Sequence, residues 1–205
     1  MANVKITDMT AASTPLAGTE LLEIVQSGVS VKVAAADIGN SASALPYASL
    51  AGRAYISAYD TSDQTGSISA ATAVKLNMTG FSSGISITNN GSGVPTRITF
   101  AAAGTYMLAP SIQFKNADTN DHDATVWFRK NGTDIANSAT IVNIPKAADG
   151  GASFFQIVFY EQVTAGQYIE VMWLPENANV TIDYTAAGAI APAIPSVIAV
   201  AERIA

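Results

Sequence analysis

The chain has 205 residues, of which 13% are charged and 49% are hydrophobic, and its formal net charge is −6. This composition excludes an intrinsically disordered chain, and the acidic balance argues against direct contact with nucleic acid. The chain contains no cysteine, which excludes disulfides and thiolate-bound metals, and it shows neither a membrane-spanning run of about 18 apolar residues nor a secretory leader.

The first 40 residues are predicted to form a short β-hairpin that attaches to another protein. Two apolar-rich runs, 20–26 and 29–33, flank Ser27-Gly28, which suits a hairpin turn. A hairpin of this size is marginally stable in water, so we expect it to dock on a partner. The apolar residues available for this contact are Leu21, Leu22, Ile24, Val25, Val31 and Val33. Residues 34–38 could add one helical turn.

Small residues at positions 40–44 indicate a linker. We therefore divide the chain into an attachment segment over residues 1–40, a linker over 41–52 and one β domain over 53–205.

The β domain is predicted from apolar residues that recur at every second position between turn signals. The rows are, in chain order, Val74, Leu76 and Met78; Ile85 and Ile87; Ile98 and Phe100; Tyr106, Leu108, Ile112 and Phe114; Val126 and Phe128; Phe155, Ile157 and Phe159; Ile169, Val171 and Trp173; Val180, Ile182 and Tyr184; and Ile198 and Val200. Asn131-Gly132 follows one of these strands and favours a tight hairpin. About nine strands without a long helix predict an all-β, antiparallel jelly-roll sandwich.

Two of the expected strands are apolar on both faces, although one face of a sandwich strand usually meets water. The additional apolar residues are Phe154, Val158 and Tyr160 on one strand, and Tyr168, Met172 and Leu174 on the other. A second apolar face needs a second cover. We expect that cover to be another subunit, and the alternative is a loop or the N-terminal segment.

No set of residues predicts catalysis or a cofactor, so we do not expect an enzyme. His122 is the single histidine, which excludes multi-histidine metal sites, and no nucleophile elbow accompanies it. The polar loop around it could hold calcium through Asp118, Asn120, Asp121 and Asp123, although it lacks the glycine and the distal glutamate of an EF-hand. The simpler interpretation is a solvated hairpin tip.

Three aromatic residues, Trp127, Tyr55 and Tyr59, are candidates for a glycan-binding platform. Packing at a subunit contact or under a loop is the alternative interpretation for them.

The N-terminal part resembles a known attachment segment. Residues 5–10 (KITDMT), 15–28 (PLAGTELLEIVQSG) and 31–38 (VKVAAADI) follow the order and spacing of the segment that attaches many phage fibre and head-surface proteins to the particle. This resemblance implies a bacteriophage virion protein that binds the major capsid protein or another virion protein.

The second part resembles the C1q/TNF-like jelly-roll domains of phage structural proteins. The resemblance is carried by residues 98–100 with 104–106, by 126–133, by 163–171 and by 194–198, although Gln167 stands where many relatives have aspartate. It implies a homotrimer on the virion surface, made in the cytoplasm of a bacterial host.

The expected function is capsid decoration, in which the protein acts as a trimeric cement on the particle surface. No heptad stalk or repeat separates the attachment segment from the jelly roll, so the domain should stay close to the surface that it binds. The alternative is a short tail fibre or receptor-binding tip that recognises a host-surface glycan or protein. A soluble signalling ligand is a third class, against which the phage-type segment argues. We expect neither nucleic acid nor a membrane as a partner.

Overall fold

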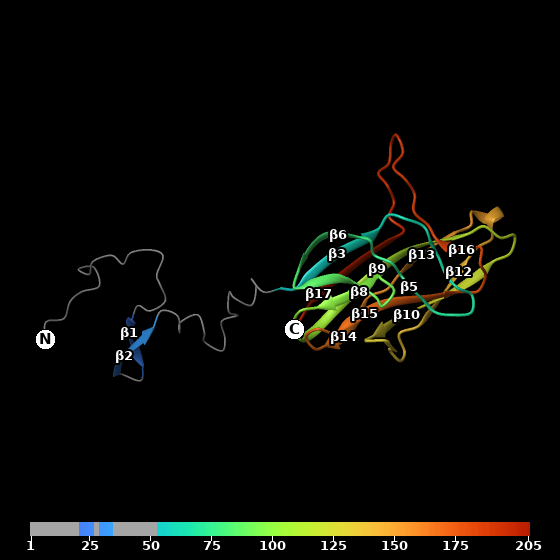
Figure 1. Ribbon diagram of the computed structural model, residues 1–205. Coiled ribbons are helices and arrows are strands. Elements are labelled where there is room, and N and C mark those ends of the chain that lie inside the picture. Colours follow the sequence, from blue (N-terminus) through green and yellow to red (C-terminus); the bar gives the residue numbers. More distant parts are fainter. Residues whose placement is uncertain (1–20, 27–28, 35–52) are drawn as a thin grey trace. The chain divides into compact units, whose positions relative to one another are not determined.

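The computed structural model describes residues 21–26, 29–34 and 53–205 (Figure 1). The chain divides into two compact units, Met1–Gly52 and Arg53–Ala205. In the first unit, β1 (Leu21–Gln26) and β2 (Val29–Ala34) pair antiparallel in continuous register. The hairpin predicted from the sequence is therefore present, and all six predicted attachment residues lie on its strands. Residues 35–38 of the expected helical turn and the linker over 41–52 lie outside the described residues.

The second unit consists of two antiparallel sheets packed face to face, as the sequence predicted. The first, here called the β10 sheet, contains in spatial order β11 (Thr133–Asp134), β10 (His122–Lys130), β15 (Tyr168–Pro175), β8 (Pro95–Phe100) and β7 (Ile85–Asn89), with β12 (Thr140–Ile144) on β10 and β5 (Thr72–Ala73) on β15. β15 pairs with β10 on one edge and with β8 and β5 on the other, and these strands are far apart from it in sequence, which gives the jelly roll its crossovers.

The second sheet, here called the β9 sheet, is built around the longest strand. It contains β4 (Gln64–Thr65), β16 (Val180–Ile182), β9 (Gly104–Asn116), β17 (Val197–Arg203), β3 (Tyr55–Asp60) and β6 (Met78–Ser83), with β13 (Ala152–Gln156) and β14 (Phe159–Val163) both on β9. A short 3-10 helix at Ala147–Asp149 precedes β13.

The hydrophobic core lies between the sheets and contains most of the predicted inward rows. Alternate residues of β8, β9, β10 and β15 are buried there, among them Phe100, Tyr106, Phe128 and Trp173. The Asn131-Gly132 hairpin is confirmed, since both residues adopt positive φ, 49° and 83°, between β10 and β11. Aspartate, asparagine and glycine tolerate this conformation better than other residues.

Four predicted rows differ from the structure. Tyr184 lies beyond the end of β16 and does not belong to the core. Met78 does not join Val74 and Leu76 in the core, because the chain between β5 and β6 is irregular and Met78 begins β6 on the exposed side. The row at 155–159 is divided between β13 and β14. On β17, Ile198 and Val200 face outward, because the inward positions are Val197, Ala199 and Ala201.

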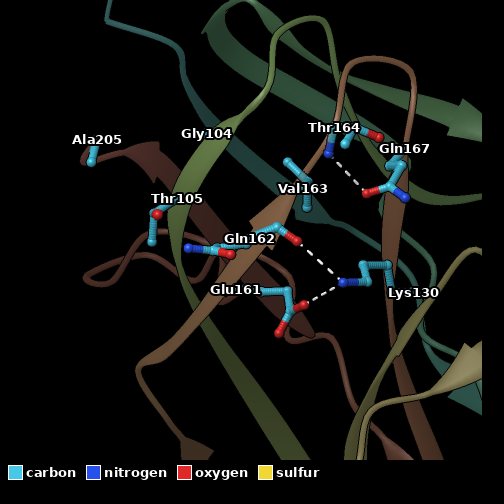
Figure 2. Close-up of a pocket in the computed structure, with 9 residues that line it drawn as sticks. All are labelled: Gly104, Thr105, Lys130, Glu161, Gln162, Val163, Thr164, Gln167 and Ala205. Carbon is cyan, nitrogen blue, oxygen red and sulfur yellow. Dashed lines mark hydrogen bonds and ion pairs between the residues drawn. The ribbon is translucent and has the colours of Figure 1, made fainter.

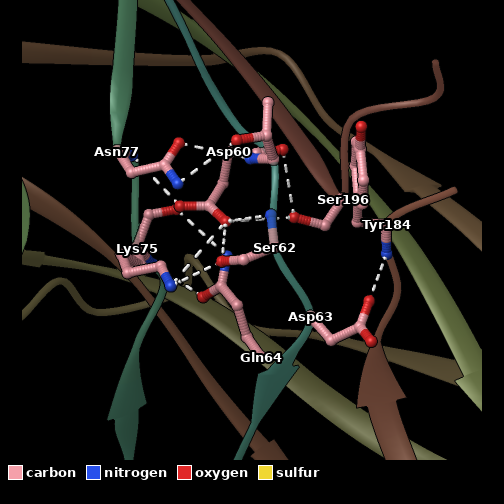
Figure 3. Close-up of polar contacts among 9 residues, drawn as sticks. Asp60, Ser62, Asp63, Gln64, Lys75, Asn77, Tyr184 and Ser196 are labelled. Atoms are coloured by element: carbon pink, nitrogen blue, oxygen red, sulfur yellow. Dashed lines mark hydrogen bonds and ion pairs between the residues drawn. The ribbon is translucent and has the colours of Figure 1, made fainter. Parts of the chain in front are cut away.

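A buried carboxylate joins three segments at one end of the β9 sheet (Figure 3). Asp60 ends β3 and has no solvent exposure. Its Oδ1 accepts hydrogen bonds from the N–H and the hydroxyl of Ser62 at 2.9 and 2.6 Å, and its Oδ2 accepts one from the N–H of Asn77 at 3.1 Å. The N–H of Ser196, immediately before β17, donates to the Asp60 carbonyl at 3.0 Å.

Candidate self-association surface

The outer face of the β9 sheet exposes a group of large apolar side chains among uncharged polar ones. Phe154, Val158 and Tyr160, which the sequence predicted for a subunit interface, are 55%, 52% and 55% exposed, respectively. Phe154 and Tyr160 stand opposite Gln113 and Met107 of β9, which belong to the outward set of that strand. Phe154 and Tyr160 therefore share one face, and Val158 is exposed in the segment that joins β13 to β14.

Strands from the other side of β9 extend this face. Ile198 and Val200 of β17 point outward opposite Tyr59 and Ser57 of β3, and Tyr55 of β3 and Phe81 of β6 are exposed further along the same sheet. The rings of Tyr55 and Phe81 meet edge to face with their centroids 6.0 Å apart. Together with Val200 they border a shallow hollow of about 380 Å³. The sequence did not predict these residues for a subunit interface: the alternation on β17 was assigned to the wrong face, Tyr55 was considered for a glycan platform, and Phe81 was not singled out.

Among the outward-facing residues of the described strands, charged groups lie only at the two ends of this face. Lys115 on β9 pairs with Asp183 at 3.4 Å at one end, and Glu202 on β17 pairs with Arg53 at 2.7 Å at the other. An outer sheet face usually alternates with polar residues. An extended apolar face bordered by charge is typical of a protein–protein contact.

The second predicted triplet lies on the opposite side of the sandwich. Tyr168, Met172 and Leu174 belong to the outer face of the β10 sheet, because Ile169, Val171 and Trp173 fill the core. Met172 is only 2% exposed, since it lies between Trp127 of β10 and Ala73 of β5. The two triplets therefore cannot share one flat interface.

The aromatic rings of Tyr168 and Trp127 on this opposite face are already engaged. The Arg97 guanidinium lies 4.1 Å from the centre of the Tyr168 ring. Trp127 Nε1 donates to Asp134 at 2.8 Å. Tyr55 and Tyr59 belong to the β9 sheet instead. The structure does not bring Trp127, Tyr55 and Tyr59 together as a glycan platform.

In the candidate calcium loop, each of the three carboxylates is bound to a different protein donor. Asp121 Oδ1 accepts the N–H of Lys146 at 2.8 Å, and Asp123 Oδ1 accepts Asn143 Nδ2 at 2.9 Å. The backbone carbonyl of Asn120 accepts a hydrogen bond from Asn116 Nδ2 at 2.8 Å. Across the described residues, no group of three or more histidine, cysteine, aspartate or glutamate side chains is arranged to hold a metal ion.

Asp118 is the most strongly perturbed carboxyl of this loop. A hydrogen bond from Asn179 at 3.1 Å, the contact with His122 at 3.2 Å and the N–H of Thr119 together hold its pKa well below the usual range. These donors favour the charged form. His122 also faces the Glu176 carboxylate at 3.7 Å on its other side.

We expect Asp118→Asn to weaken the dependence of stability on acid pH. The folded pKa is below the unfolded one, so the stabilisation is present above about pH 4 and is lost as pH falls towards the folded value. Urea unfolding between pH 2 and 7 should show a shallower acid loss for the variant than for the wild type. Asp149→Asn, at an exposed carboxylate, is the control and should keep the wild-type slope; equal slopes in all three proteins would contradict the assignment.

A polar pocket of about 550 Å³ opens at the other end of the sandwich (Figure 2). Lys130 of β10 pairs there with the Glu161 carboxylate of β14 and donates to the Gln162 carbonyl at 3.1 Å. The two charges neutralise each other and join strands of different sheets. The ion pair at this pocket therefore holds the two sheets together.

Comparisons with known proteins bear on the fold. No protein-family model matches the chain, and no curated protein matches its sequence. The chain is similar to murine APRIL in crystal structures at pH 8.5, pH 5.0 and pH 8.0, with TM-scores of 0.47, 0.46 and 0.48. The identities are 12%, 9% and 12%, and each alignment covers 74% of this chain and 99% of the other. The jelly-roll assignment depends on the strand order and register described above.

Among the residues that the structure describes, no helix is long enough and apolar enough to cross a membrane.

Proposed function

We propose that this protein is a structural component of a bacteriophage virion, in which the jelly roll forms a homotrimer through the outer face of the β9 sheet. The observation that carries the self-association is the exposed apolar face around Val200 and Tyr160, which has charge only at its ends. Exposed faces of this kind mark contacts between proteins, and burying them is favourable in proportion to their apolar area.

The virion location rests on the resemblance of the N-terminal residues to phage attachment segments. We propose that the β1–β2 hairpin binds the major capsid protein or another virion protein. A trimer presents three such hairpins, and simultaneous binding multiplies the affinity of a weak single contact. The short distance in sequence between hairpin and jelly roll favours capsid decoration over a tail fibre.

Light scattering after size exclusion tests the self-association directly, and a homotrimer is the expected result. A monomer at every concentration up to about 100 μM, well above typical dissociation constants of stable oligomers, would overturn it.

The copy number per purified particle, measured by mass spectrometry against the major capsid protein, tests the location. Hundreds of copies in a simple ratio to the capsid subunit would establish decoration. A few to a few tens would favour the tail or one vertex, where host-receptor binding is the function to test.

The attachment is tested by Ile24→Asp combined with Val33→Asp. Ile24 pairs with Val31, and Val33 pairs with Leu22, so the four apolar residues occupy equivalent positions of the hairpin register. We expect the variant to be lost from purified particles while the jelly roll keeps its thermal transition. The matched control is Glu23→Gln with Lys32→Gln, at an alternate pair of the same register. Normal copy number in the aspartate variant would show that the hairpin is not the anchor.

A further inference from the structure

A protruding hairpin between β16 and β17 has no role in the fold described so far. β16 and β17 pair with the same edge of β9, one after the other, while β4 and β3 pair with their other edges. Between β16 and β17, the sheet therefore has β9 on one side and β4 and β3 on the other. Residues 183–196 have no room within the plane of the sheet and can leave it only through one of its two faces. The inner face is filled by the core.

The base of the hairpin confirms that it leaves through the outer face. Thr185 and Ile194 pair with each other through backbone hydrogen bonds of 2.8 and 3.0 Å. They border a small hollow with Gln113 and Lys115, which are outward residues of β9. The hairpin, drawn in red, stands clear of the sandwich in Figure 1.

The hairpin is apolar to its tip. Residues 184–201 contain no charged side chain, and the Gly188 N–H donates to the Ala191 carbonyl at 3.0 Å to close the tip. Ile190 at the tip is 101% exposed, so it contacts no other part of its own jelly roll. Covering a fully exposed isoleucine with another surface is favourable, because it removes apolar area from water.

We propose that residues 185–194 form an intersubunit arm that packs on the outer face of the β9 sheet of a second copy of this chain. The inference rests on the proposed self-association. The arm rises from the same face that carries Phe154, Ile198 and Val200, so a copy that covers this face meets the arm as well. The arm and the central part of the face are both uncharged and apolar, which makes each a suitable cover for the other.

Site-specific cross-linking of the full chain tests the arm. The protein contains no cysteine, so Ile190→Cys provides a single attachment point for a maleimide–benzophenone cross-linker. We expect covalent dimers and trimers on a denaturing gel after irradiation, with acceptor peptides from β13, β14 or β17. Ala165→Cys, in the exposed turn between β14 and β15, is the matched control and should give only monomers.

A second variant measures how much the arm contributes to assembly. Ile190→Asp should raise the concentration of half-dissociation by roughly tenfold, because a charge would replace a buried apolar tip, while Thr164→Asp leaves it unchanged. The site is fully exposed in the single copy, so the substitution should not affect folding.

The outcomes separate this inference from the proposed function. A wild-type trimer whose Ile190→Cys adducts are all intramolecular would overturn the arm and leave the self-association standing. A wild-type monomer would overturn both. Cross-links that form only with another virion protein would assign the hairpin to that partner and overturn the packing on a second copy.

Discussion

Val200→Asp is expected to convert the trimer into folded monomers. Val200 lies on β17 between Ser57 of β3 and Ala109 of β9, near the centre of the apolar face. Its neighbours are small, so its side chain stands clear and is 36% exposed in a single copy. An unpaired carboxylate buried in an interface costs about 3–5 kcal/mol, which corresponds to a more than ~100-fold weaker association.

Sedimentation velocity over a range of concentrations measures this effect, and circular dichroism verifies that the β structure is kept. Ile141→Asp is the matched control, because Ile141 is an exposed apolar residue on β12 of the other sheet. We expect the control to assemble like the wild type. A Val200→Asp protein that remains trimeric would show that the interface lies elsewhere, and the outer face of the β10 sheet would be tested next through Leu174.

The sequence predicted the elements of the jelly roll because most of its signals are local. Alternating apolar residues specify which side of a strand is buried, and Asn131-Gly132 specifies a tight turn. The exposed triplet of Phe154, Val158 and Tyr160 was predicted in the same way, from a strand that is apolar on both faces.

Partners distant in sequence could not be predicted from these local patterns. Tyr168, Met172 and Leu174 showed the same two-faced pattern, but β15 belongs to the other sheet, and Met172 is covered by its position between β10 and β5. Which strand pairs with which depends on tertiary packing, so two similar patterns gave two different surfaces.

The intersubunit arm illustrates the same difficulty at the level of one segment. Residues 186–201 are nearly as apolar as a buried strand, and Gly188, Pro192, Pro195 and the polar Ser196 interrupt them. Those interruptions signal a turn, but they do not show that the turn stands away from the sheet. The hairpin stands away from the sheet because β16 and β17 pair one after the other along the same edge of β9.

The Asp60 carboxylate is the interaction whose loss should destabilise a single copy most clearly, because it joins segments that are far apart in sequence. It binds Ser62 after β3, Asn77 before β6 and, through a 3.9 Å contact, the Lys75 ammonium (Figure 3). Its own carbonyl accepts from Ser196. A buried donor that loses its acceptor costs about 1–3 kcal/mol, because it cannot recover its hydrogen bond from water.

Asp60→Ala is therefore expected to lower the free energy of unfolding by about 3 kcal/mol, since three partly buried donors, the N–H and hydroxyl of Ser62 and the N–H of Asn77, lose one carboxylate together. Chemical denaturation at fixed protein concentration measures the change, because dissociation of a trimer also contributes to the apparent stability. Asp63→Ala is the control. Asp63 is exposed and accepts a single hydrogen bond, from the N–H of Tyr184 at 2.7 Å, so it should cost less than about 1 kcal/mol. Equal losses in the two variants would show that the Asp60 carboxylate adds nothing beyond a single surface hydrogen bond, and the junction of β3, β6 and β17 would then depend on apolar packing and on backbone hydrogen bonds such as that from Ser196 to the Asp60 carbonyl.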